Sequence, residues 1–147
     1  MSTTPIKTVL IAGANCNLGP AIVDELLVVN RFDISVLART DSKATFPRVQ
    51  SNVNVFRTDY SLNSLNEALA LAKPDAVVSA LDAVDSKVAD LQTNLIDAAK
   101  TNGVKRFLPS EFGADSTNAE VVRLVPIYEI KRRATAHLKR LESDDFS

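Results

Sequence analysis

Several residue types and patterns are scarce in this chain, and each absence excludes a class of protein. The 147 residues include one cysteine, Cys16, which excludes an internal disulfide framework and favours a reducing compartment. The single histidine, His137, has no partner in the sequence that suggests a metal site, so we expect none. No apolar run approaches the ~20 residues that cross a bilayer, so we expect no membrane partner. The formal net charge of −1 provides no broad basic surface for nucleic acid.

The first ten residues lack a charged leader followed by a long apolar segment, so we expect no signal peptide and a cytoplasmic location. The composition is 46% hydrophobic and 24% charged, which suits one soluble globular domain with a sizeable core. We see no repeats, low-complexity tracts or linkers. The sequence therefore predicts a single domain over residues 1–147.

Short apolar runs alternate with longer segments of helical periodicity along the whole chain. The apolar runs predict strands at residues 7–12, 34–38, 53–58, 76–80 and 104–108. Apolar residues at helical spacing predict helices at residues 18–29, 62–72, 88–98 and about 124–141. This order is typical of an α/β fold with a doubly wound, Rossmann-like parallel sheet. Right-handed crossovers predict the strand order 3-2-1-4-5, with a ligand crevice at the carboxyl ends of strands 1 and 4.

The end of the chain follows the last predicted helix by only a few residues. Strand 5 would then form an uncovered edge, which is a liability for association. We therefore expect the domain to be truncated before a C-terminal substrate-binding half, with a next strand beginning near Phe146.

The loop after the first strand, GANCNLG, is close to the phosphate-binding turn of dinucleotide folds. Gly13 permits the reversal out of the strand, and Gly19 permits close packing of the following helix. Cys16 stands where a middle glycine normally lets the backbone approach a pyrophosphate at the helix N-terminus. We expect this to weaken binding by ~1–3 kcal/mol without abolishing it. The alternative is a plain strand-to-helix turn, but the following βαβ pattern favours a dinucleotide.

Two further features of this region bear on chemistry. Cys16 precedes a helix, where a thiol with a lowered pKa could instead form a redox switch. Arg39 ends the second strand, where an NAD site would place an acidic residue for the ribose 2′-hydroxyl. Because a guanidinium suits a 2′-phosphate, the sequence favours NADP(H) over NAD(H).

The segment KRFLPSEFGAD at residues 105–115, together with GANCNLG, VLART and PIYEIK, resembles the isoflavone reductase-like branch of the NmrA-like family, which are atypical short-chain dehydrogenases. The resemblance covers essentially the whole chain, and RFLPSEFG is its most specific part. The resemblance implies that the pyrophosphate loop consists of Gly13, Asn15, Cys16, Asn17, Leu18 and Gly19, and that the 2′-phosphate is bound by Arg39. It also implies that the cofactor lies along Ser79 and Ala80, and that the nicotinamide is bordered by Pro109, Ser110, Glu111 and Phe112. The catalytic or ribose-binding lysine would be Lys131.

Helical periodicity separates Lys131 from the other four cations of the last helix. At about 100° per residue, Lys131 lies at the margin of the apolar stripe, where a partly desolvated amine could transfer a proton. Tyr128 lies three residues from Lys131 and not four, so we expect it to be structural. His137 is expected to pack. Asp59 could meet the adenine edge, and Glu111 could instead serve as a local cap or ion-pair partner.

Two functions remain open from the sequence. The first is an oxidoreductase that reduces a small aromatic or phenolic molecule with NADPH, the fragment alone being unable to complete a substrate pocket. The second is a non-catalytic, dinucleotide-sensing regulator of the NmrA type, or a decayed or truncated paralogue. Neither reading defines the substrate or the oligomeric state.

Overall fold

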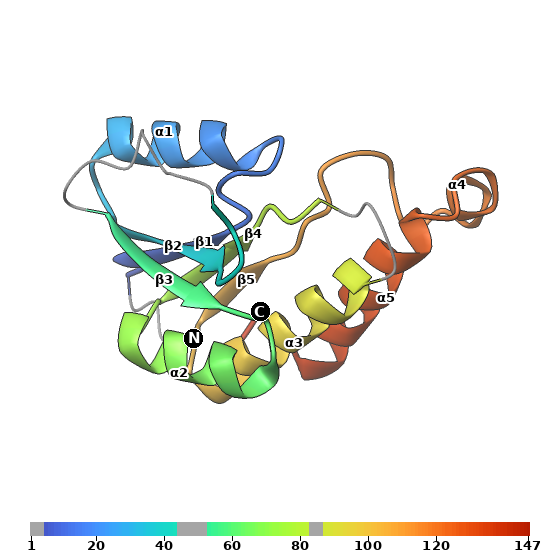
Figure 1. Cartoon of the computed structure of the whole chain (residues 1–147). Helices are drawn as coiled ribbons and strands as arrows, with labels where there is room; N and C mark the ends of the chain where they lie inside the picture. The colour runs from blue at the N-terminus through green and yellow to red at the C-terminus, as the bar shows by residue number, and fades with distance from the viewer. Residues whose placement is uncertain (1–4, 44–52, 83–86) are drawn as a thin grey trace.

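The centre of the fold is a parallel sheet (Figure 1), seen in a computed structural model that describes residues 5–43, 53–82 and 87–147. Its five strands lie in the order β3-β2-β1-β4-β5. They are β1 Thr8–Ala12, β2 Asp33–Arg39, β3 Asn54–Thr58, β4 Ala76–Ser79 and β5 Arg106–Leu108. The predicted doubly wound sheet and its strand order are confirmed.

Helices cover the two faces of the sheet unequally. Helix α1, Gly19–Val29, lies on one face, and the other face carries α2 Leu62–Ala72, α3 Lys87–Thr101 and α5 Tyr128–Leu141 (Figure 1). Successive side chains of β1 enter two separate apolar cores, because strand residues alternate between faces. Val9 and Ile11 pack with α1, whereas Leu10 and Ala12 pack with the opposite three helices.

Local sequence signals set the ends of α2. The Ser61 hydroxyl accepts a hydrogen bond from the Ser64 backbone N–H at 3.3 Å, which satisfies a free donor of the first turn. The helix ends at Lys73, whose left-handed backbone (φ 46°) precedes Pro74. The predicted boundaries of this helix are therefore confirmed.

The last predicted helix, by contrast, begins later than expected, and a short helix that was not predicted precedes it. A short helix α4 covers Ala119–Leu124, and α5 begins at Tyr128 rather than near Leu124. The break lies at Val125, whose extended backbone (φ −132°, ψ 85°) precedes Pro126. A proline disfavours the helical conformation of the residue before it, which explains the interruption.

The outer edge of β5 is partly covered by the end of the chain. The Ser147 N–H donates to the Lys105 carbonyl at 3.2 Å, and the Phe107 N–H donates to the Ser147 carbonyl at 2.7 Å. These two bonds flank Arg106, as they do between parallel strands. Phe146 is buried in the apolar core that also contains residues of α2, α3 and α5.

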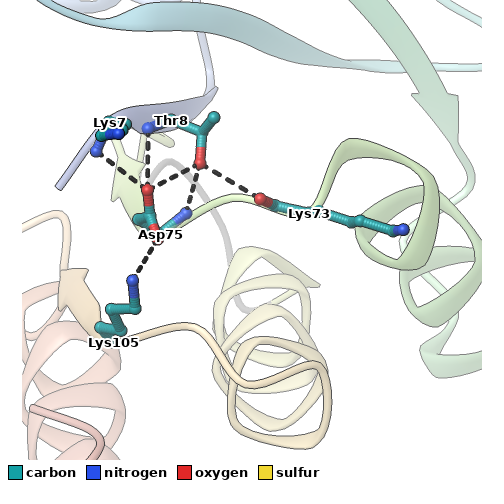
Figure 2. Close-up of polar contacts among 5 residues, drawn as sticks. All are labelled: Lys7, Thr8, Lys73, Asp75 and Lys105. Atoms are coloured by element: carbon teal, nitrogen blue, oxygen red, sulfur yellow. Dashed lines mark hydrogen bonds and ion pairs between the residues drawn. The ribbon is translucent and has the colours of Figure 1, made fainter. Parts of the chain in front are cut away.

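A single carboxylate joins the opposite, amino-terminal ends of the strands. Asp75 accepts hydrogen bonds from the backbone N–H groups of Lys7 and Thr8 and from the Thr8 hydroxyl, and it pairs with the Lys105 ammonium (Figure 2). The ammonium of Lys105, followed by these backbone donors, holds the pKa of Asp75 far below its ordinary value. This cluster holds β1, β4 and β5 in register at the end of the sheet away from the crevice.

Candidate functional site

A groove of about 350 Å³ opens at the carboxyl ends of β1 and β2 and beside the segment after β4. This is the place where ligands bind in open parallel α/β sheets. Its lining combines the glycine loop, the end of β2 and residues from β3–α2, β4–α3 and α3. These are Gly13, Ala14, Asn15, Cys16, Leu37, Ala38, Arg39, Ser42, Tyr60, Leu81, Asp82 and Leu91.

The two glycines of the loop are both required by close backbone contacts. Gly13 has a left-handed backbone (φ 80°), and a Cβ there would lie 2.6 Å from the backbone carbonyl of Ala80. A Cβ on Gly19 would lie 2.0 Å from the Gly13 carbonyl oxygen. The loop therefore closes tightly between β1, α1 and the segment after β4, as a phosphate cradle requires.

The start of α1 has the properties of an anion site. Leu18 occupies the N-cap without a side-chain hydrogen bond, and the first turn of this described helix contains no acidic residue. Its free backbone N–H groups and the positive end of the helix dipole favour a phosphate. Asn15 and Cys16 line the groove, whereas the lining does not include Asn17, Leu18 or Gly19.

Cys16 fits into the loop without backbone strain. Its N–H donates to the Gly13 carbonyl at 2.9 Å, and it is not among the described non-glycine residues with left-handed backbones. Burial raises the pKa of the Cys16 thiol, and the charge of Asp82 adds to the increase, although a backbone hydrogen bond to Asp82 opposes it in part. A raised pKa favours the neutral thiol, which argues against the redox switch that the sequence left open.

A second side chain near the loop is Asp82, which sequence reasoning missed. Its carboxylate accepts a hydrogen bond from the Asn17 amide at 3.3 Å, across the groove from the end of β4 to the glycine loop. Its position three residues after β4 was the available signal, because residues that follow this strand border the crevice. A carboxylate here opposes the charge of a pyrophosphate and prefers a hydrogen-bond donor.

Arg39 ends β2 and lines the groove, as the sequence predicts. Its Nε and Nη2 atoms each donate to the Asp41 carboxylate at 3.0 Å, so two of its five N–H donors are engaged. The Arg57 guanidinium donates to the carbonyls of Arg39 and Ser42, at 3.2 and 3.1 Å, and supports the turn after β2. This corner of the groove therefore carries two guanidinium groups and one carboxylate.

Asp59 takes no part in the lining of the groove. Its carboxylate accepts a hydrogen bond from the Ser61 N–H at 2.8 Å, in the turn that leads into α2. The neighbouring Tyr60 lines the groove instead, and its left-handed backbone (φ 63°) accompanies a nearly complete burial of the ring.

Ser79 and Ala80 lie beneath the groove rather than on its surface. Both are buried, and the Ser79 hydroxyl donates to Gln92 of α3 at 2.7 Å. The backbone of Ala80 faces Gly13, so its contribution is the close packing of the loop.

The segment 109–113 follows β5 and contacts Lys131 of α5. Ser110 is 6% exposed, whereas Phe112 is 47% exposed. Lys131 is 9% exposed, and its Nζ donates to the Ser110 carbonyl at 2.6 Å and lies 3.5 Å from the Phe112 carbonyl. Pro109, Ser110, Phe112 and Lys131 thus form one unit, which lies beside the groove and outside its lining.

Lys131 differs from the other cations of α5, as periodicity predicts. It is the one buried cation of this helix, whereas Arg132, Arg133, Lys139 and Arg140 are exposed. Arg132 and Arg133 both pair with Glu129. The asymmetry directs a single ammonium toward the segment after β5.

Neighbouring side chains complete this region. The Tyr128 hydroxyl accepts a hydrogen bond from the Ala114 N–H at 3.1 Å, which agrees with a structural tyrosine. Glu111 accepts a hydrogen bond from the Ser116 hydroxyl through Oε2, and its Oε1 is buried with no partner among the described residues. These contacts make it neither a helix cap nor an ion-pair partner. His137 contacts Asp97 at 2.6 Å, and this polar pair joins α5 to α3.

The described helices include none that is both long and apolar enough to cross a membrane. Over the same ranges, no group of three or more His, Cys, Asp or Glu side chains could hold a metal ion.

Comparison with known proteins gives matches among curated proteins and among solved structures. Oxidoreductase aprR of Aspergillus flavus is 37% identical over 137 residues, which cover 92% of this chain and 44% of aprR. Oxidoreductase BOA1 of Botryotinia fuckeliana is 37% identical over 108 residues, which cover 72% of this chain and 35% of BOA1. The chain therefore spans less than half the length of these relatives.

Solved structures agree in fold and extent. The complex of leucoanthocyanidin reductase with NADPH from Vitis vinifera has a TM-score of 0.78 and 27% identity, over 91% of this chain and 46% of that one. AtPrR2 with NADP⁺ and (+)pinoresinol has a TM-score of 0.74 and 26% identity, over 93% of this chain and 47% of that one. The model of the NmrA-like family matches residues 5–144, and the chain belongs to this family.

Proposed function

We propose that the chain is the NADP(H)-binding domain of an isoflavone reductase-like oxidoreductase, which reduces a small aromatic or phenolic substrate. The observation that carries the proposal is the groove at the carboxyl ends of β1 and β2, with the glycine loop on one side and Arg39 on the other. This arrangement suits a dinucleotide whose pyrophosphate lies at the N-terminus of α1.

The residues present fit such a coenzyme. Gly13 and Gly19 allow the backbone approach, and the uncapped first turn of α1 supplies N–H donors. Arg39 would bind the 2′-phosphate, with the exposed Arg57 close behind it. The coenzyme, when bound, supplies hydride chemistry, while the protein binds it, orients it and excludes water.

Lys131 is the side chain to which we assign the work at the reacting end. Its ammonium has three donors, and two of them are directed at the carbonyls of Ser110 and Phe112. The third would contact the nicotinamide ribose or deliver a proton to the substrate. Burial of Lys131 among carbonyl groups holds it in one orientation for either role.

The substrate class is supported by the neighbours in fold, whose names refer to pinoresinol and leucoanthocyanidin. The relatives are more than twice as long as the matched region, so we propose that further chain completes the substrate pocket beside the exposed Phe112. Residues 1–147 would then be one Rossmann-like domain, incomplete at its C-terminus and located in the cytoplasm.

A dinucleotide sensor without catalysis is the second candidate function. The observation that favours it is the carboxylate of Asp82, together with Cys16, in the pyrophosphate part of the groove. Such a protein would bind the coenzyme and change its affinity for a partner without turnover.

Calorimetric titration with NADPH and NADH tests the proposal directly. We expect NADPH to bind more tightly than NADH. We expect Arg39→Ala to lower this preference about tenfold, as for loss of a charged hydrogen-bond pair. Arg106→Ala is a matched control, since Arg106 is exposed on β5 and lies outside the groove lining. Absence of binding by either coenzyme would reject both functions, and binding without Lys131-dependent NADPH oxidation in the full-length protein would leave the sensor.

A further inference from the structure

The side chain of Gln92 is the centre of a buried polar network next to the groove. Gln92 lies on α3 and is 3% exposed. Its Oε1 accepts two hydrogen bonds, from the Ser79 hydroxyl at 2.7 Å and from the Ser110 N–H at 2.9 Å. Both lone pairs of this oxygen are therefore used, and one atom joins the end of β4 to the segment after β5.

The N–H, the hydroxyl and the carbonyl of Ser110 each make a hydrogen bond to another part of the fold. Its N–H donates to Gln92, its hydroxyl donates to the Leu81 carbonyl at 2.8 Å, and its carbonyl accepts from Lys131 Nζ. These three partners come from α3, the segment after β4, and α5. Because Leu81 itself lines the groove, the position of Ser110 is fixed relative to the groove wall.

The rest of this segment has fewer restraints. Phe112 is exposed, and Gly113 has a left-handed backbone (φ 147°) that favours glycine. Loss of the Gln92 acceptor would leave the buried N–H of Ser110 and the hydroxyl of Ser79 unsatisfied. The segment could then regain those bonds only by moving, and Lys131 would move with the carbonyl it contacts.

We propose that Gln92 is a positioning residue, which acts through Ser110 to set Lys131 and segment 109–112 at the nicotinamide end of the groove. This inference rests on the proposed function. The adenosine end depends on Arg39 and the turn after β2, which share no hydrogen bond with Gln92 among the described contacts. Gln92 therefore governs binding of the nicotinamide half and not of the adenosine half.

The test compares Gln92→Leu with two ligands. NADPH binding is followed by its own fluorescence, since the chain contains no tryptophan. Adenosine 2′,5′-bisphosphate, which lacks the nicotinamide half, is measured by competition. We expect NADPH to bind about tenfold more weakly to Gln92→Leu, as for loss of one buried hydrogen-bond acceptor, and the bisphosphate to change by less than about twofold.

Asn102→Leu is the matched control. Asn102 follows α3 directly, and its amide donates to Asn66 of α2 and to the Ala98 carbonyl of α3, both at 2.8 Å. Neither bond involves segment 109–112. Removing it disturbs the same helix to a similar degree without touching Ser110. We expect both ligands to keep their affinity within about twofold, because no bond to the groove is lost.

Gln92→Met keeps the length of the side chain and removes the oxygen, so it serves if the leucine variant does not fold. Equal weakening of both ligands, or no weakening of NADPH, would overturn the inference. Hydrogen exchange at the Ser110 amide gives a readout without any ligand, and we expect it to rise about tenfold or more in Gln92→Met. If wild-type protein binds neither ligand, the proposed function fails, and unchanged exchange at Ser110 would by itself reject the positioning role.

Discussion

The carboxylates at the two ends of the sheet differ in how many donors and cations surround them. At the amino-terminal end, Asp75 is surrounded by backbone donors and the Lys105 ammonium, so its charge is fully compensated (Figure 2). At the carboxyl end, Asp82 meets the Asn17 amide and the neutral Cys16 thiol but no cation among the described residues, and Asp41 meets the exposed Arg39. A compensated charge stabilises the fold, whereas a weakly held charge can be exchanged for a ligand, so stability and binding are separated along the strands.

The largest effect that we expect comes from Gly19→Ala, at the groove end. The new Cβ would lie 2.0 Å from the Gly13 carbonyl oxygen, so the loop or α1 must move. We expect a loss of about 3 kcal/mol in the free energy of unfolding, together with loss of NADPH binding. Urea denaturation and fluorescence titration measure the two effects.

Gly103→Ala is the control for that substitution. Gly103 has a left-handed backbone (φ 72°), unlike Gly19, and no atom lies within 4 Å of the added Cβ. Only the backbone strain of about 1 kcal/mol should remain, with binding unchanged. Equal losses in the two variants would show that close packing of the glycine loop is unimportant.

Asp75→Asn should have the next largest effect, at the opposite end. The neutral amide loses the pairing with Lys105 and presents donors where acceptors are needed, so we expect a loss of about 2 kcal/mol without a change in coenzyme affinity. Because the folded-state pKa of Asp75 is lowered, its contribution is present above about pH 4 and is lost as the pH falls further. Unfolding measured between neutral and acidic pH should therefore depend less on pH in the variant, and an unchanged pH profile would contradict the role.

Asp82→Asn should strengthen binding where the other variants weaken it. Removal of one negative charge beside the expected pyrophosphate should tighten NADPH binding about tenfold, and the gain should shrink at high salt. Glu67→Gln removes the same charge from the exposed surface of α2 and should have no such effect. Weaker binding in Asp82→Asn would mean that the carboxylate contacts the coenzyme favourably.

The smallest effect should come from Asp41→Ala. Arg39 would no longer be paired with Asp41, so its two engaged donors would become available to a 2′-phosphate. We expect the preference for NADPH over NADH to rise about threefold, because an exposed ion pair contributes little. A fall in the preference would indicate that Asp41 orients the guanidinium for binding.

Local patterns in the sequence were sufficient for the sheet and for several residues that line the groove, among them Gly13, Cys16 and Arg39. The alternation of apolar runs and helices predicts the strand order, and helical spacing identifies Lys131 as the buried cation of α5. The break before α5 was missed because the apolar pattern continues through Pro126, although proline carries a local signal.

The residues that escaped prediction act over long separations in the chain. Asp75 contacts Thr8 from 67 residues away, Asp82 contacts Asn17 from 65, and Gln92 contacts Ser110 from 18. An isolated Asp or Gln carries no sign of its partner, because the partner is defined only when strands and helices assemble.

Helix α3 contacts distant parts of the molecule at successive points along its length. Leu91 reaches the groove, Gln92 reaches Ser110, and Asp97 reaches His137 on α5. A helix is stiff along its axis, so a shift at one of these contacts is transmitted to the others. A ligand that displaces Leu91 would therefore also shift the Asp97–His137 contact that holds α5 against α3.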